Sequence, residues 1–265
     1  MNIPGAQPSD GGGKRLMILL VGRAFCGKST AAATFPKPVF FDFDHKCPTA
    51  DQLSAIHNRP FDPIPMVPFW DAEFCDKLAP RKNPNHVPNR KDAFINYLKH
   101  YVVTPDADKR ISYDHTLVVD STTALEEAIH RQVETEGIPI SPKTGKPDGF
   151  YLWARKIDYL RDVFAILQAW PGVVIVNMHE QDEKNEEGNP TGRIRPLMSG
   201  SYADMLPSKF TCMFRQRVEG TGPTAKYLWD ILPTRAFTSN NALNIKQSPI
   251  PATYWDLMKA AGVEA

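Results

Sequence analysis

The sequence predicts an α/β fold, in which a mainly parallel sheet is covered by helices on both faces and antiparallel strands come late. Two observations support this prediction. Four short runs are largely apolar without strict alternation, so both faces of each strand should be buried, as in parallel sheets. Segments with helical spacing lie between these runs, which is the order that builds such a sheet. The runs are LMILLV (16–21), VFFDF (39–43), TLVV (116–119) and VVIV (173–176).

Helices are expected between these strands and near the end of the chain. Good helix formers or apolar residues spaced three and four apart predict them. They cover residues around 31–33, 92–102, 123–135, 151–170 and 252–261. Residues 210–218 and 227–232 alternate well enough between apolar and polar side chains to be late strands that could pair antiparallel.

The composition is typical of a globular protein. Of the 265 residues, 42% are hydrophobic and 23% are charged, which suits one large domain or two small ones. The 31 basic and 30 acidic residues give a net charge of +1, so any basic binding surface must be local. No apolar run is long enough to cross a bilayer, and residues 1–14 lack a signal-peptide core. We therefore expect no membrane partner and a cytoplasmic location.

The chain divides into a tail, a core and a C-terminal segment. Residues 1–14 are polar and rich in glycine, which predicts a flexible tail. Residues 15–248 are expected to form the core, and residues 249–265 a C-terminal helical segment. Within the core, residues 47–92 contain many of the 24 prolines of the chain and are interpreted as a Pro-rich insertion.

The segment after the first strand, GRAFCGKS (22–29), matches the P-loop pattern G-x-x-x-x-G-K-[ST] in full. The glycines let successive backbone N–H groups turn toward phosphate oxygens. Lys28 would supply charge to the β- and γ-phosphates, and Ser29 a hydroxyl ligand for Mg²⁺. A strand leads into the motif and a helix leads out, as this pattern requires. The predicted nucleotide-binding residues are Gly22, Arg23, Ala24, Phe25, Cys26, Gly27, Lys28, Ser29 and Thr30.

Carboxylates stand at the ends of two further predicted strands. Asp120 follows TLVV and is placed to bind Mg²⁺ together with Ser29. Asp42 and Asp44 end the strand after the P-loop helix, and alternation sends them to one face. Asp44 lies farther out and is the better candidate to activate the attacking water. Ordinary interpretations also exist, since Asp120 could cap the following helix and the other two could be surface carboxylates.

Polar residues also end the fourth predicted strand. Asn177 and His179 follow VVIV and are placed to sense a γ-phosphate. A lone histidine is more often structural than catalytic, so the position of His179 among the other motifs is what favours a function.

The order of these motifs resembles the core of the RecA-like ATPases. The P-loop is followed by DFDH (42–45), VVDSTTAL (118–125) and VIVNMH (174–179). In that family the second segment carries the catalytic acid, usually Glu where this chain has Asp44. The third is its Walker B segment, and the last ends in Gln or, in some hexameric helicases, His. The sequences of these segments are most similar to those of phage-encoded nucleotide-binding proteins, which include single-strand annealing recombinases of the Sak type.

The resemblance implies an ATPase that uses ATP and Mg²⁺, with Lys28, Asp44, Asp120 and His179 as its catalytic residues. RecA-like ATPases assemble into rings or filaments, so self-association is expected, and a neighbouring subunit would complete the site with a cation. Arg235 is the best match for that cation and Lys226 the second. The implied function is phage recombination on single-stranded DNA by annealing or strand exchange, in the host cytoplasm, with a single-strand DNA-binding protein as a further partner.

Two loops match the DNA-binding loops of that family. One covers residues 138–149 and the other residues 181–195. The predicted DNA-binding residues in them are Lys143, Lys146, Lys184, Arg193 and Arg195. The second loop also carries several acidic residues, so its cations could simply be solvated.

Three other functions remain open from the sequence. A P-loop ATPase of this kind could be a helicase, a helicase loader or a packaging accessory. A P-loop kinase for a small molecule or nucleotide is a second class, although no Arg-dense lid segment follows the core. The third is a nucleotide-binding protein without turnover, since Asp44 stands where Glu is usual.

Overall fold

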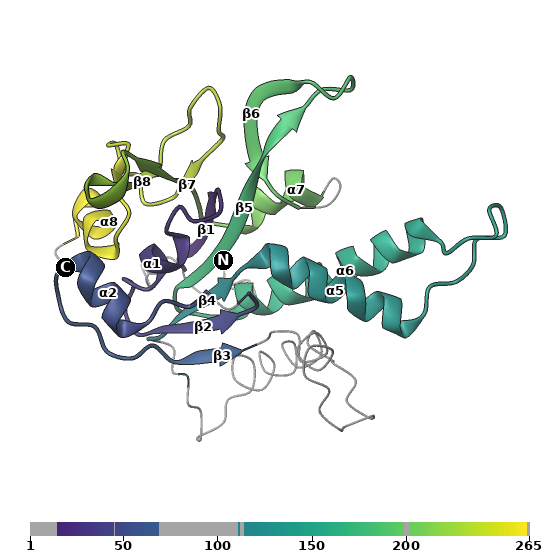
Figure 1. The fold of residues 1–265 in the computed structure, drawn as a ribbon, viewed down its shortest axis with the longest axis horizontal. Coiled ribbons are helices and arrows are strands. Elements are labelled where there is room, and N and C mark those ends of the chain that lie inside the picture. The colour runs from purple at the N-terminus through teal and green to yellow at the C-terminus, as the bar shows by residue number, and fades with distance from the viewer. Residues whose placement is uncertain (1–14, 45, 69–110, 112–113, 199–201, 264–265) are drawn as a thin grey trace, which may run out of the picture.

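A mixed sheet runs through the molecule in the order β10-β8-β7-β1-β5-β4-β2-β3 (Figure 1). The computed structural model describes residues 15–44, 46–68, 111, 114–198 and 202–263. The strands are β1 (Met17–Gly22), β2 (Pro38–Asp42), β3 (Met66–Pro68), β4 (Thr116–Asp120), β5 (Val174–Lys184), β6 (Pro190–Pro196), β7 (Cys212–Glu219), β8 (Lys226–Asp230), β9 (Asn240–Asn241) and β10 (Ile250–Pro251).

Six neighbouring strands, from β7 to β3, run parallel to one another. The predicted mainly parallel sheet is therefore confirmed, and so are the late antiparallel strands, because β8 pairs antiparallel with β7. One expectation is only half right: β7 itself is parallel to its other neighbour, β1. Strand β5 separates β1 from β4. This order brings the carboxyl ends of β1, β2, β4 and β5 to the same edge of the sheet, where ligands bind in open α/β sheets.

Helices cover both faces, as predicted. They are α1 (Lys28–Ala32), α2 (Ala50–His57), α5 (Thr122–Glu136), α6 (Gly149–Ala169), α7 (Tyr202–Met205) and α8 (Tyr254–Ala260), with short 3₁₀ helices at Leu206–Lys209 and Gly222–Thr224. Each face of the sheet packs against helices in its own hydrophobic core, and successive residues of a strand point alternately into one core and the other. Ile18 and Leu20 of β1 pack with α1, α2 and α8, whereas Leu19 and Val21 pack with α5 and α6.

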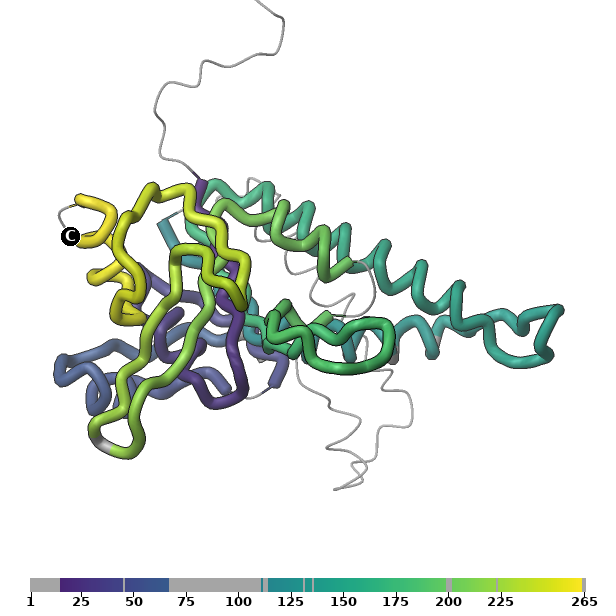
Figure 2. Tube along the Cα trace, turned by 90° about the horizontal axis from the view of Figure 1, so that it is seen from above, coloured from purple at the N-terminus to yellow at the C-terminus, as the bar shows by residue number. Residues whose placement is uncertain are grey.

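Helices α5 and α6 form a hairpin that projects from the sheet, with residues 137–148 at its far end (Figures 1 and 2). We call this hairpin the arm. Both helices were predicted with nearly these boundaries. Local caps explain where they begin, since the Ser121 hydroxyl caps α5 and the Asp148 carboxylate accepts the backbone N–H groups of Phe150 and Tyr151 at the start of α6.

The predicted Pro-rich insertion contains regular structure in its described part. Helix α2 begins with a capping box at Thr49, and β3 adds a parallel strand beside β2. The helix expected at 92–102 and the tail expected at 1–14 lie outside the described residues. At the other end of the chain, β10 pairs with β8, and the predicted helix is observed as α8. Within the described ranges, no helix combines the length and apolar character that crossing a membrane requires.

Candidate nucleotide site

The P-loop connects β1 to α1 and depends on glycine at both ends. A Cβ on Gly22 would lie 2.5 Å from the carbonyl oxygen of Gln216. Gly27 has a φ of 83°, in the left-handed region, and a Cβ there would lie 2.7 Å from the ring of Tyr227. The loop thus packs directly against β7 and β8, which leaves no space for side chains at these two positions.

Lys28 is buried within the loop that it belongs to. Its Nζ donates hydrogen bonds to the carbonyl oxygens of Gly22 (2.9 Å) and Arg23 (2.8 Å), and it lies 3.7 Å from Sγ of Cys26. The ammonium group is therefore held at the centre of the turn by its own backbone. Cys26 is buried, and burial raises the pKa of its thiol, with Lys28 opposing that effect. The thiol is therefore neutral and packs the loop.

A buried amide supports the P-loop from the neighbouring strand. Gln216 of β7 donates from Nε2 to the carbonyl oxygen of Cys26 at 2.8 Å. Its Oε1 accepts the indole N–H of Trp229 at 2.9 Å, and both side chains are fully buried. No motif identified Gln216 in the sequence, because its contact to the loop spans 190 residues.

The two aspartates at the end of β2 and just after it, Asp42 and Asp44, have different positions. Asp42 is buried and accepts the backbone N–H groups of Asp44, Lys46 and Cys47, at 3.2 to 3.3 Å. It therefore holds the turn that follows β2. The Asp44 carboxylate instead lies at the cavity, where its Oδ2 pairs with Nζ of Lys46 at 2.8 Å. This arrangement favours Asp44 over Asp42 as the candidate base, as the position of Asp44 farther out from the strand predicted.

Asp120 is buried at the end of β4 and is suited to bind a cation. Its Oδ2 has no hydrogen-bond partner among the described residues. Burial raises the pKa of its carboxyl to about 6; the Ser29 hydroxyl opposes this shift, and the charges of Asp44 and Asp42 add to it. A buried carboxylate oxygen beside a serine hydroxyl is the donor set that Mg²⁺ prefers. Ser29 and Asp120 therefore fit the predicted Mg²⁺ ligands.

The raised pKa of Asp120 predicts a pH-dependent stability without metal. Because the folded protein binds this proton more tightly, the stabilisation is complete below pH 3.8, the ordinary value, and is lost as the pH rises through about 6. Asp120→Asn should thus be more stable than the native chain by about 3 kcal/mol at pH 8, and equal to it near pH 4. Urea unfolding in EDTA measures this. Equal stability of the two proteins at pH 8 would contradict the assignment, and added Mg²⁺ should stabilise only the native chain.

His179 lies beside the P-loop because β5 pairs with β1 and aligns it with Gly22. Burial lowers the pKa of its imidazole, and the charges of Lys28 and Lys46 lower it further. Its neutral ring is thus close to two ammonium groups. Asn177, two residues earlier, is fully buried, and its side-chain amide opposes the rise in the pKa of Asp120.

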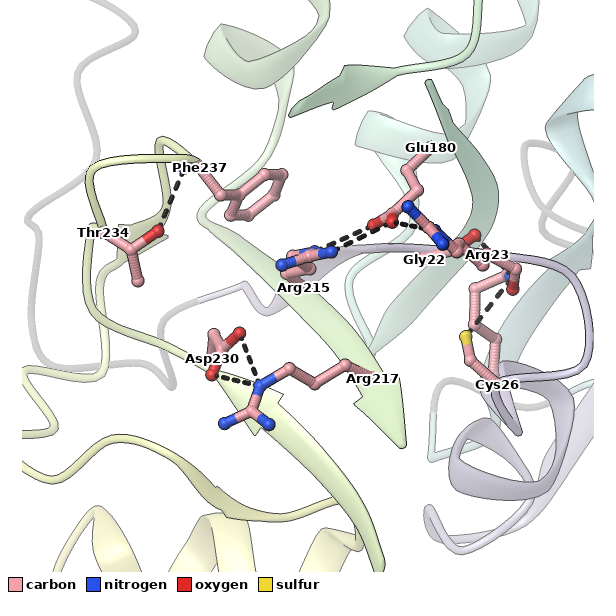
Figure 3. Close-up of polar contacts among 10 residues, drawn as sticks. Gly22, Arg23, Cys26, Glu180, Arg215, Arg217, Asp230, Thr234 and Phe237 are labelled. Carbon is pink, nitrogen blue, oxygen red and sulfur yellow. Dashed lines mark hydrogen bonds and ion pairs between the residues drawn. The ribbon is translucent and has the colours of Figure 1, made fainter. Parts of the chain in front are cut away.

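Two arginines hold the residue that follows His179. The buried Glu180 carboxylate accepts two hydrogen bonds from Arg215 of β7, at 2.9 and 3.0 Å, and one from Arg23 of the P-loop at 3.2 Å (Figure 3). A neighbouring arginine, Arg217, binds both carboxylate oxygens of Asp230 at 3.0 Å. Glu180 therefore connects β5 to the P-loop and to β7. The sequence predicted none of these ion pairs; of the residues in them, it identified only Arg23, as part of the P-loop.

These groups surround one cavity of about 440 Å³. Of the predicted nucleotide-binding residues, 25–30 line it, while Gly22, Arg23 and Ala24 form the start of the loop beside it. Asp44, Asp120 and His179 also line it, together with residues that no motif included. The latter are Lys46, Cys47, Pro48, Gln52, Ile56 and Tyr227, and Ser121 of the VVDSTTAL segment lines the cavity as well. The structure thus brings the predicted catalytic residues Lys28, Asp44, Asp120 and His179 together with Ser29 around one cavity.

The remaining predicted residues lie elsewhere. Lys143 and Lys146 are exposed in the loop of the arm, and Lys184 is exposed at the end of β5. Arg193 and Arg195 of β6 line a second cavity of about 450 Å³, which Arg235 also lines. A hydrogen bond from the Ile194 N–H to the Ala236 carbonyl, at 2.7 Å, holds these segments together. Lys226 is exposed at the start of β8.

Comparison with known proteins extends these observations. A family model described as an AAA domain matches residues 14–243. Among solved structures, a KaiC-like protein from the archaeon Pyrococcus horikoshii is similar at a TM-score of 0.44 and 15% identity, covering 89% of this chain and 84% of that one. The flagellar accessory protein FlaH from Methanocaldococcus jannaschii is similar at a TM-score of 0.39 and 14% identity, covering 89% and 83%. None of the curated proteins matches the chain.

Proposed function

Because the chain belongs to the AAA domain family and has the fold of RecA-like P-loop ATPases, we propose that it hydrolyses ATP with Mg²⁺ and couples hydrolysis to single-stranded DNA. One observation carries the first part: Lys28, Ser29, Asp44, Asp120 and His179 surround a single cavity at the carboxyl edge of the sheet. A kinase for a small molecule would need the same P-loop, but the carboxylates and histidine at the other strand ends favour attack by water.

In this proposal each group has a defined task. Lys28 neutralises charge on the β- and γ-phosphates, and Ser29 and Asp120 hold Mg²⁺, which supplies further neutralisation of the phosphates. Asp44 orients the attacking water and accepts its proton. The neutral imidazole of His179 contacts the γ-phosphate. Arg235 from a neighbouring subunit would add a cation in a ring or filament, which remains a prediction.

The arm supports the second part of the proposal. Its far end combines Lys143 and Lys146 with exposed apolar side chains, of which Phe150 is 75% and Ile140 is 60% exposed. Exposed aromatic rings next to cations suit unpaired bases and their phosphates, because bases stack on rings while the backbone pairs with ammonium groups. The second predicted loop is the β5–β6 hairpin, which begins directly after His179 and carries Lys184, Arg193 and Arg195.

The proposal extends to phage recombination by annealing or strand exchange, in a host cytoplasm and beside a single-strand DNA-binding protein. The motif resemblance is what supports this extension, and an annealing assay on complementary strands tests it against unwinding of a duplex by a helicase.

The decisive experiment measures ATP hydrolysis with and without single-stranded DNA. We expect DNA to stimulate hydrolysis, and the double variant Lys143→Ala/Lys146→Ala to need about ten times more DNA for half-maximal stimulation, because two phosphate contacts are lost. The exposed pair Lys246→Ala/Lys259→Ala is the matched control and should behave like the native chain. If the rate of ATP hydrolysis were the same with and without DNA, the proposed coupling to DNA would be wrong, and the proposed ATPase activity would remain.

A further inference from the structure

The phosphate cavity contains a second lysine that belongs to no motif. Lys46 lies in the turn after β2 and lines the same cavity as Lys28 and Ser29. Its Nζ is 2.8 Å from Oδ2 of Asp44, the candidate base; the two side chains are 48% and 17% exposed. The ammonium group thus occupies the position next to the carboxylate that would have to accept a proton.

The buried Asp42 fixes this turn. It accepts the backbone N–H of Lys46 on Oδ1 and that of Cys47 on Oδ2. These two hydrogen bonds fix the backbone that carries Lys46. The side chain of Lys46 retains the freedom of its four-carbon stem. A fixed backbone with a long, half-exposed side chain allows the ammonium group to change partners without rearrangement of the fold.

The surroundings of His179 locate the ammonium group of Lys46 relative to a nucleotide. Lys28 and Lys46 both lower the pKa of His179, so both positive charges lie near the same imidazole. Lys28 belongs to the P-loop and His179 ends the strand beside it. In the proposed function the γ-phosphate lies between Lys28 and His179, so Lys46 is within reach of the same phosphate.

Asp44 has one oxygen engaged and one free. Oδ2 accepts the ammonium group of Lys46 and, at 3.4 Å, the hydroxyl of Ser121. Oδ1 is buried and has no hydrogen-bond partner among the described residues. The pair of Lys46 and Asp44 is partly exposed, so solvent screens it, and a phosphate group of higher charge can compete for the ammonium.

We propose that Lys46 binds the γ-phosphate and, without a triphosphate, neutralises Asp44. This inference rests on the proposed function and adds a residue to it. When a triphosphate enters, the ammonium group moves from the carboxylate to the third phosphate. Asp44 then accepts a proton from water as the water oxygen bonds to the γ-phosphorus and the bond to the β–γ bridging oxygen breaks. Asp44 passes its proton to the departing phosphate, ADP and phosphate leave, and Lys46 returns to the Asp44 carboxylate.

Nucleotide affinity tests this inference separately from turnover. Binding of ADP and of a non-hydrolysable ATP analogue is measured with Mg²⁺ by calorimetry. We expect Lys46→Ala to weaken binding of the analogue about tenfold and to change ADP affinity by no more than about twofold, because only the third phosphate loses a charged contact. Lys46→Arg, which keeps the charge, should recover most of the lost affinity.

Two further variants complete the design. Lys37→Ala removes another exposed lysine that pairs with an aspartate, Asp114, away from the cavity, and should change neither affinity. Asp44→Asn should lose turnover but keep the preference for the analogue over ADP. If Lys46→Ala weakened binding of both nucleotides equally, or of neither, the inference would be overturned. The proposed function would remain, provided that the native chain binds the nucleotides. A native chain that binds neither nucleotide would overturn both.

Discussion

Lys28→Ala should abolish measurable ATP hydrolysis, with a loss of at least about a hundredfold in kcat/KM. The expected size follows from the position of the ammonium group. It is buried at the centre of the P-loop, and the carbonyl oxygens of Gly22 and Arg23 hold it there before any nucleotide arrives. A preorganised charge of this kind needs no rearrangement during the reaction, so its removal costs more than the loss of a surface lysine.

Steady-state hydrolysis and nucleotide binding should be measured together for this variant. We expect binding of both ADP and ATP to weaken, because Lys28 contacts the β-phosphate as well as the γ-phosphate. Thermal unfolding without nucleotide should change less than nucleotide binding does, because a typical hydrogen bond contributes only about 1 kcal/mol to stability. If Lys28→Ala kept native hydrolysis, the phosphate would have to bind elsewhere, and the proposed function would fail with it.

Gly22→Ala should cause the second large effect, a loss of stability of about 1–3 kcal/mol. The added Cβ would lie 2.5 Å from the carbonyl oxygen of Gln216 and 2.6 Å from Sγ of Cys26. The oxygen belongs to the backbone of β7 and cannot move alone, so β1 and β7 must separate locally. The same movement would disturb the hydrogen bond from Gln216 to the P-loop, so nucleotide affinity should fall as well.

Gly149→Ala is the matched control for this prediction. Gly149 is the exposed first residue of α6, and a Cβ there would meet nothing within 4 Å. The alanine should leave stability unchanged or raise it by up to about 1 kcal/mol, because it restricts the unfolded chain. Urea unfolding at constant pH measures both variants. Equal stabilities of Gly22→Ala and Gly149→Ala would show that β1 and β7 are not packed as closely at Gly22 as described.

The sequence predicted those features that are encoded within short segments. The apolar runs indicated β1, β2, β4 and β5, and the P-loop pattern indicated the phosphate site, because each depends on neighbouring residues in the chain. Strand ends then predicted Asp44, Asp120 and His179. These three lie together because parallel strands all point their carboxyl ends to the same edge.

The missed features depend on register and pairing between distant segments. Gln216 reaches Cys26 only because β7 pairs with β1, a parallel pairing that alternation in residues 210–218 does not indicate. Glu180 meets Arg215 for the same reason. Arg235, expected to complete the site of a neighbouring subunit, shares a cavity with Arg193 because the segment after β8 pairs with β6. Lys46 follows the DFDH segment directly, but its place at the cavity depends on the turn that Asp42 holds.

The arm begins at the edge of the sheet that carries the candidate nucleotide site and extends far from it. Helix α5 is capped by Ser121, which adjoins Asp120 and donates to Asp44, and its 15 residues span about 22 Å before the loop of residues 137–148. A rotation of α5 by about 5° at Ser121 would displace its far end by about 2 Å, given the rise of an α-helix. A small rearrangement at the phosphates therefore becomes a movement comparable to an atomic diameter where the exposed aromatic side chains lie. The far end of the arm would therefore respond to any rotation of α5 near Ser121, although it makes no contact with the cavity itself.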